Sequence, residues 1–206
     1  MQEYAGTKNP SGKVIGLTGG IASGKSTATV FLEKMGCISL DADKIGHEVY
    51  LKGMPAYSKI LNTFGLGVMN KHEEIDRQKL GQIVFADKKM LDKLCKIVWP
   101  EIKTLGIKKI SHAKQAHPHA PIVLEAAVLL EANWESMVDE VWVIYIDPKL
   151  AIQRLMQRNG LSFSDADARL KAQMTNAERL TKADKSYENK GSTEALETAL
   201  KHMLYD

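Results

Sequence analysis

The chain has little cysteine. Only Cys37 and Cys95 occur among its 206 residues, and they lie far apart in apolar surroundings. Two cysteines without metal-ligand spacing exclude a disulfide framework and a zinc site, and they predict reduced, buried thiols. The chain also lacks an apolar run that approaches the length of a membrane span. We therefore expect a cytoplasmic protein without a membrane partner.

An excess of charge of either sign is absent as well. There are 28 Lys and Arg residues against 25 Asp and Glu residues, which gives a formal net charge of +3. That value is too small to indicate a nucleic-acid partner. Length and composition suit a single domain with, at most, a small inserted subdomain. Residues 1–12 are polar and lack the apolar stretch of a secretory signal, so we expect a flexible leader before a domain spanning 13–206.

What the chain does contain is a phosphate-binding motif. It has the pattern G-x-x-x-x-G-K-S and reads Gly19-Gly20-Ile21-Ala22-Ser23-Gly24-Lys25-Ser26-Thr27. An apolar run precedes it, and a helical pattern that stops at Gly36 follows it. Backbone N–H groups of such a loop hold phosphate oxygens, while Lys25 reaches the β- and γ-phosphates and Ser26 ligates Mg²⁺. The segment therefore predicts binding of a nucleoside triphosphate.

Five short runs have the composition of β-strands. They are Val14–Thr18, Cys37–Leu40, Ile122–Leu124, Val141–Ile146 and, more weakly, Lys185–Glu188. The first, third and fourth are almost continuously apolar, as in parallel strands that are covered on both faces. Helical stretches separate the runs, so we predict an α/β fold of the P-loop NTPase type with a doubly wound, five-stranded parallel sheet.

A long interval between the second and third runs is predicted to be helical. Apolar residues recur with helical spacing over 57–64 and 91–98, and Pro100 stands where a helix could restart. Such an interval is too long for a plain crossover, and we read residues 44–111 as a helical insertion that forms one wall of a substrate cleft. The histidines that follow lack the partners of a metal site and are expected in a solvated loop.

Carboxylates follow two of the predicted strands. Asp41 and Asp43 close the second run, which we expect to neighbour the strand before the phosphate loop. One of them should cap the next helix, and the other should accept a proton or hold Mg²⁺ through water. Glu125 ends the third run and is a candidate for indirect contact with Mg²⁺. Glu131 ends a helix-like stretch, Ala126–Glu131, and its role stays open.

A helical lid is predicted over residues 148–175. Asp147-Pro148 is typical of a helix start, and a second helix is expected to begin at Ser164. Arginines of a lid would neutralise charge on a transferred phosphoryl group, although a solvated helix face is the alternative. The polar side chains concerned are Arg154, Arg158, Arg169 and Gln173.

The chain resembles the dephospho-coenzyme A kinases from about Val14 to about Leu196. The matching segments are Gly16–Ser26, Asp41-Ala42-Asp43, Phe64-Gly65, Asp76–Phe85, Leu124–Glu131, Gln153–Arg158, Gln173, Ala183-Asp184 and Asn189–Gly191. The family often has Gly at Ala22, Asp at Glu125, Pro at Ala127 and His at Trp99. Trp99-Pro100 and the segment Glu125–Ala132 look more like the kinase half of animal bifunctional coenzyme A synthases.

The resemblance implies ATP-dependent phosphorylation of the ribose 3′-hydroxyl of dephospho-coenzyme A, the last step of coenzyme A biosynthesis, with Mg²⁺. It implies a catalytic base at Asp43, with Lys25, Arg154 and Thr18 as further catalytic residues. It implies that Arg158 and Asn189 bind ATP with the loop, and that Asp41, Arg77, Glu125 and Gln173 bind substrate. A monomer or weak oligomer is expected. The alternatives are a nucleoside or nucleotide kinase, and a regulatory module that binds ATP without catalysis.

Overall fold

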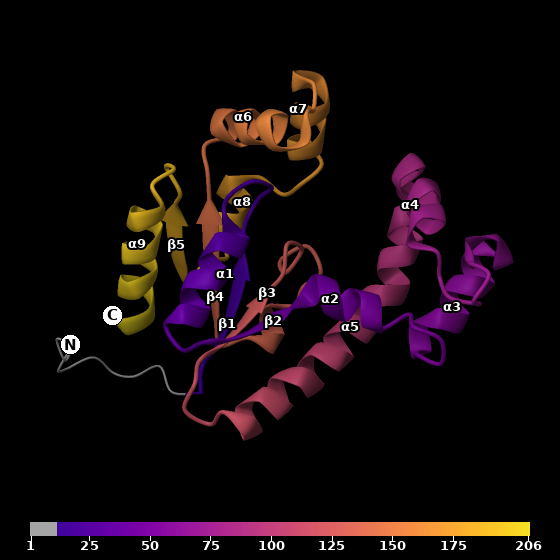
Figure 1. Ribbon diagram of the computed structural model, residues 1–206, viewed down its shortest axis with the longest axis horizontal. Coiled ribbons are helices and arrows are strands. Elements are labelled where there is room, and N and C mark those ends of the chain that lie inside the picture. Colours follow the sequence, from indigo (N-terminus) through magenta and orange to yellow (C-terminus); the bar gives the residue numbers. More distant parts are fainter. Residues whose placement is uncertain (1–11) are drawn as a thin grey trace. The chain divides into compact units, whose positions relative to one another are not determined.

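The computed structural model describes residues 12–206, so residues 1–11 of the expected leader lie outside it (Figure 1). Two units make up the chain. One combines the N-terminal segment up to Leu40 with residues from Ile110 to Asp206, and the other runs from Asp41 to Lys109. Among residues 12–206, none of the helices has both the length and the apolar character that crossing a membrane requires.

A five-stranded parallel sheet forms the centre of the first unit. Its strands are β1 (Val14–Thr18), β2 (Ile38–Asp41), β3 (Ile122–Glu125), β4 (Glu140–Tyr145) and β5 (Lys185–Glu188). All five predicted strands are present, each to within one residue at either end. The order is β2-β3-β1-β4-β5, with Gly16 of β1 opposite Leu124 and Val141. The predicted parallel α/β fold is therefore confirmed.

The prediction that the first and second strands are adjacent in the sheet is wrong, because β3 lies between β1 and β2. Burial explains this order. The apolar residues of β3 are buried, whereas every residue of β2 is only partly buried. A strand buried on both faces belongs inside a parallel sheet, and a partly exposed strand suits its edge.

Helices α1 (Lys25–Lys34) and α9 (Thr193–Tyr205) lie side by side along one face of the sheet, as Figure 1 shows. Their apolar residues share a core with the strands, which includes Phe31, Leu32, Trp142 and Leu200. Cys37 is buried in the same core, and burial raises the pKa of its thiol to about 11. It is free, as is the partly buried Cys95 of the second unit.

The segment after β3 was expected to be helical and is not. Residues 127–133 form successive turns, and the 3₁₀ helix η2 (Glu135–Met137) follows. Asn133 has a φ of 54°, which is left-handed backbone that an α-helix does not contain. Leu129 and Val138 of this stretch press against Gly16, so closely that a Cβ there would lie 2.6 Å from Leu129. Packing on the sheet thus overrides the local helical pattern.

The predicted lid region contains α6 (Pro148–Asn159) and α7 (Phe163–Lys171), with α8 (Asn176–Leu180) after them. Asp147 caps α6 by accepting from the N–H groups of Lys149 and Leu150, as expected. The predicted start of α7 at Ser164 is two residues late. Ser162 is the cap because its Oγ accepts from the N–H of Asp165 at 3.1 Å.

The second unit is helical, as predicted. It contains α2 (Ala42–Glu48), α3 (Pro55–Phe64), the 3₁₀ helix η1 (Leu66–Val68), α4 (Arg77–Ala86) and most of α5 (Lys88–Ala116). The predicted restart at Pro100 is wrong, because α5 continues through it. Proline removes one N–H donor, but the 29-residue helix keeps its other hydrogen bonds on both sides. Of the three histidines expected in a loop, His112 also lies in α5.

Candidate active site

The phosphate loop connects β1 to α1. Gly24, just before the helix, has a φ of +94°, and a Cβ at this position would lie 2.4 Å from the Asn189 amide nitrogen. Only glycine therefore fits there. No side chain caps the N-terminus of α1, so its first N–H groups stay directed at the space beyond the loop. A helix N-terminus with free N–H groups behind a glycine loop is the arrangement expected of an anion site, so it fits the prediction from the sequence.

The Glu125 carboxylate contacts three polar side chains in the first turns of α1, those of Lys25, Ser26 and Thr29. Its Oε1 lies 3.5 Å from Lys25 Nζ and accepts from Ser26 Oγ at 3.1 Å, while its Oε2 accepts from Thr29 Oγ1 at 2.6 Å. A hydroxyl and a carboxylate beside each other are oxygen donors of the type that Mg²⁺ prefers. Ser26 and Glu125 thus fit the expected ion. Thr29 was not predicted, although it follows Lys25 by one helical turn.

Two amide side chains, the buried Asn189 and the partly buried Gln173, hydrogen-bond to the backbone of the loop. Asn189, only 6% exposed, donates from Nδ2 to the Ser23 carbonyl oxygen at 2.7 Å. Its Oδ1 accepts from the N–H of Gly191 at 3.2 Å. Gln173 Oε1 accepts from the N–H of Ile21 at 2.8 Å. Both residues were predicted as ligand-binding, and in this structure both contact the loop backbone.

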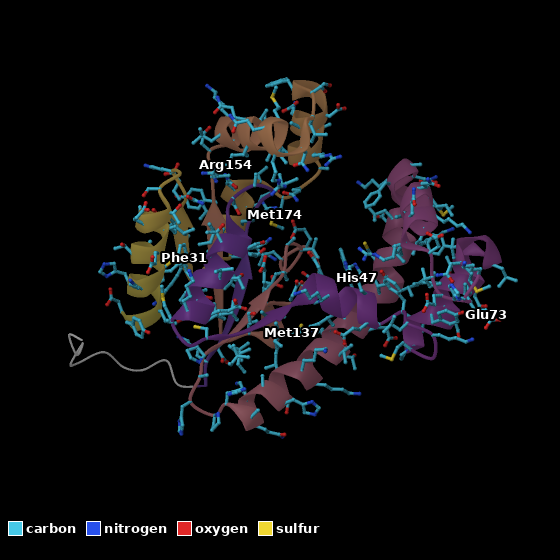
Figure 2. The ribbon with its side chains drawn as sticks, in the orientation of Figure 1. Phe31, His47, Glu73, Met137, Arg154 and Met174 are labelled. Carbon is cyan, nitrogen blue, oxygen red and sulfur yellow. The ribbon has the colours of Figure 1, made fainter. Side chains whose placement is uncertain are left out.

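Lid residues also reach the loop. Arg154, labelled in Figure 2, donates from Nη1 to the Ala22 carbonyl oxygen at 3.1 Å. The small core between α6 and α7 packs against Ile21 and Ala22. Ala22 has a φ of 62°, a left-handed conformation that is costly for any residue with a Cβ. Arg158, by contrast, is exposed in the last turn of α6 and donates to Asn159.

Buried polar atoms without a partner gather around the loop. In the part of the chain that the structure describes, they belong to Thr18, Ser23, Glu131 and Arg179. Thr18 immediately precedes the loop and Ser23 lies within it. Buried polar groups are nearly always hydrogen-bonded, and exceptions often mark functional sites. The concentration of these atoms here supports a binding site at the loop.

Sequence reasoning missed Arg179. Its side chain is only 2% exposed, and its Nη2 lies 3.3 Å from Glu131 Oε1. Burial lowers the pKa of Arg179, and the negative charge of Glu131 opposes that shift. The two residues are separated by 48 positions, so no local pattern connects them. The one available signal was a carboxylate, Glu131, in an otherwise apolar segment.

One member of the carboxylate pair, Asp41, caps the next helix, as expected of one of the two. Asp41 caps α2, because its Oδ1 accepts from the N–H groups of Asp43 and Lys44 at 2.9 and 3.1 Å. Asp43 is exposed on the first turn of α2. Because Asp41 provides the cap, the carboxylate of Asp43 is not needed for that purpose.

Arg77 is the first residue of α4, whose N-terminus is capped by Asp76. Its positive charge acts on Tyr50, whose pKa is raised by burial against the opposing effect of Arg77. The Tyr50 ring lies 6.2 Å, centroid to centroid, from that of His47, which Figure 2 labels on α2. Tyr50 and His47 were not predicted as site residues. The second unit thus contains an aromatic, cationic cluster beside a helix N-terminus.

The sheet, the loop and the carboxylate after β3 define a P-loop kinase. The fold agrees with a solved shikimate kinase from Acinetobacter baumannii, which has a TM-score of 0.51 at 17% identity over 93% of this chain and 92% of that one. A family model described as dephospho-CoA kinase matches residues 13–195. The chain belongs to the dephospho-CoA kinase family.

Individual relatives agree with this assignment. A dephospho-CoA kinase of Carboxydothermus hydrogenoformans is 42% identical over 88% of each chain, and one of Bacillus licheniformis is 42% identical over 94% of this chain and 95% of its own. The solved protein TT1252 of Thermus thermophilus is 31% identical, with a TM-score of 0.75 over 93% of this chain and 96% of that one.

Proposed function

We propose that this chain transfers the γ-phosphoryl group of ATP to the ribose 3′-hydroxyl of dephospho-coenzyme A, which yields coenzyme A. Membership of the dephospho-CoA kinase family over residues 13–195 supports this reaction. The observation that carries it in the structure is the cluster of Lys25, Ser26 and Glu125 at the phosphate loop.

On the donor side, the loop N–H groups and the N-terminus of α1 hold the phosphates of ATP, and Lys25 contacts the β- and γ-phosphates. Lys25 exchanges its contact with Glu125 for the phosphates when ATP binds. Ser26 and Glu125 would hold Mg²⁺, which neutralises charge on the β- and γ-phosphate oxygens when bound. Positioning and neutralisation, rather than covalent chemistry, supply most of the rate.

On the acceptor side, Asp43 orients the 3′-hydroxyl and accepts its proton as the phosphoryl group transfers. Its exposed position on α2 supports this role, since Asp41 already serves as the cap. Arg77 binds a phosphate of the acceptor at the N-terminus of α4, where the helix dipole adds to the attraction.

Arg154 stabilises the charge that develops on the transferred group. Its contact with the Ala22 carbonyl oxygen supports this role, because it holds the guanidinium at the loop that would bind the phosphates. Cationic groups placed in this way accelerate phosphoryl transfer by factors of about 10³–10⁵. Arg158, at the end of α6, contributes only if the lid closes further.

The experiment is a coupled assay of ADP release with dephospho-coenzyme A, adenosine, AMP and shikimate as acceptors. We expect turnover with dephospho-coenzyme A alone. Preference for adenosine or AMP would instead favour a nucleoside or nucleotide kinase. Lys25→Met should abolish turnover, whereas Lys34→Met, at the exposed end of the same helix, should not change it. ATP binding without turnover for every acceptor would contradict the proposal.

A further inference from the structure

The ion pair between Arg179 and Glu131 is unusual for its burial. Arg179 is the most deeply buried charged residue among those described, and Arg179 Nε and Glu131 Oε2 have no hydrogen-bond partner there. Desolvation of such a pair commonly costs as much as its attraction returns, so stability alone does not explain it. An incompletely paired guanidinium in the interior indicates a function in its surroundings.

The surroundings are the first half of the phosphate loop. Nη2 of Arg179 pairs with Glu131, whereas Nη1 points toward Gly20, where a Cβ would lie only 3.2 Å away. Gln173 Oε1 lies 3.8 Å from the same point and accepts from the N–H of Ile21. Two side chains from residues 173–179 thus enclose Gly20 and Ile21. The second half of the loop is held separately, through Asn189 and Ser23.

We infer that Arg179, held in place by Glu131, is a positioning residue for the phosphate loop in the phosphoryl-transfer reaction. It fixes the backbone at Gly20 and directs the positive end of a buried ion pair toward the loop. A charge in this low-dielectric setting acts more strongly on bound phosphate than one at the surface. The inference rests on the proposed kinase function and adds a residue pair to its ATP site.

The forked guanidinium suits this task, because one arm pairs with Glu131 while the other lies at Gly20. A lysine ammonium provides a single charged centre and cannot occupy both positions at once. An apolar pair of similar volume would fill the space without directing charge to the loop. These differences allow positioning to be separated from stability.

The test compares Arg179→Met, the double variant Arg179→Met/Glu131→Met, and Arg179→Lys. The single methionine variant leaves the partly buried carboxylate of Glu131 unpaired and should melt at a lower temperature. The double variant removes both charges and should melt near the wild-type temperature. Despite its recovered stability, we expect its kcat/KM for ATP to stay about tenfold or more below wild type, with the KM for dephospho-coenzyme A within about twofold.

Binding of ADP, measured by calorimetry, adds a readout that does not depend on the acceptor, and it should weaken in parallel. A wild-type chain that binds ADP but phosphorylates no acceptor would contradict the proposed function. The comparison of ADP binding between wild type and the Arg179 variants would still test the positioning role. The matched control is Lys182→Met/Glu135→Met, a more exposed ion pair of 2.8 Å that connects the same two segments away from the loop. It should leave both ADP binding and turnover unchanged.

A double variant that recovers its melting temperature together with wild-type kcat/KM for ATP would overturn the inference, since the pair would then be purely structural. If the double variant does not fold, Arg179→Lys decides. This variant should fold and lose about fivefold or more in kcat/KM for ATP, because its ammonium serves only one position. Wild-type kcat/KM in the folded lysine variant would equally overturn the inference.

Discussion

Removal of the Asn189 side chain should damage both stability and ATP binding. Asn189→Ala deletes two hydrogen bonds, one to the Ser23 carbonyl and one from the Gly191 N–H. Each contributes about 1 kcal/mol, and a buried carbonyl left without its donor adds about 1–3 kcal/mol. Ser23 is 1% exposed, so water does not replace the lost donor. We expect the free energy of unfolding to fall by about 3–5 kcal/mol.

The same change should weaken ATP binding, because the second half of the loop loses its anchor. A loosened loop has to be reordered when ATP binds, and a cost of about 1.4 kcal/mol raises the KM for ATP about tenfold. Urea unfolding measures the first effect, and initial rates at varied ATP measure the second. Addition of saturating ADP should recover less stability in the variant than in wild type.

Asn176→Ala provides the matched control. Its Nδ2 donates to the carbonyl oxygen of Ile146, directly after β4, at 2.8 Å, so the bond that it makes is not to the backbone of the loop. This variant should lose about 1 kcal/mol of stability and keep the wild-type KM for ATP. Equal KM values for ATP in Asn189→Ala and wild type would refute the claim that Asn189 organises the loop. An increase of the same size in both variants would attribute the effect to general destabilisation.

Three further predictions concern the acceptor and the lid. Asp43→Asn should lower kcat by about 10²-fold or more with little effect on the KM for ATP. Asp41→Asn should mainly lower the melting temperature. If Asp41→Asn loses turnover and Asp43→Asn loses stability instead, the two assignments are reversed. Arg77→Ala should raise the KM for dephospho-coenzyme A about tenfold or more while ATP binding stays the same, and a loss confined to ATP would place the acceptor phosphate elsewhere. Hydrogen exchange over residues 150–173 should slow when ATP and acceptor bind together, and equal exchange with and without both ligands would indicate a rigid lid.

Strand positions were predictable from the sequence, most clearly for β1, β3 and β4, because each of these three is a short, nearly continuous apolar run that is buried in the sheet. Their order was not. A run of apolar residues identifies a strand, but the choice of its neighbour depends on how much of each strand is buried. The partly exposed β2 takes the edge, and β3 takes the place next to β1 that the sequence suggested for β2.

The phosphate loop and Glu125 were predictable because the chemistry of each is contained in one short segment. The pair of Arg179 and Glu131 was not, since the contact depends on turns after β3 that the helical pattern of residues 126–131 concealed. Thr29 shows an intermediate case. Its spacing from Lys25 places both on one helix face, but only the structure reveals that Glu125 contacts them together.

The most direct test of the central claim is transfer of radiolabelled γ-phosphate from ATP to dephospho-coenzyme A, compared with its 3′-deoxy analogue under the same conditions. The account predicts a labelled product that co-migrates with coenzyme A from the first acceptor, and none from the second. Label on the 3′-deoxy analogue, or no label on either acceptor from a folded chain that binds ATP, would contradict it.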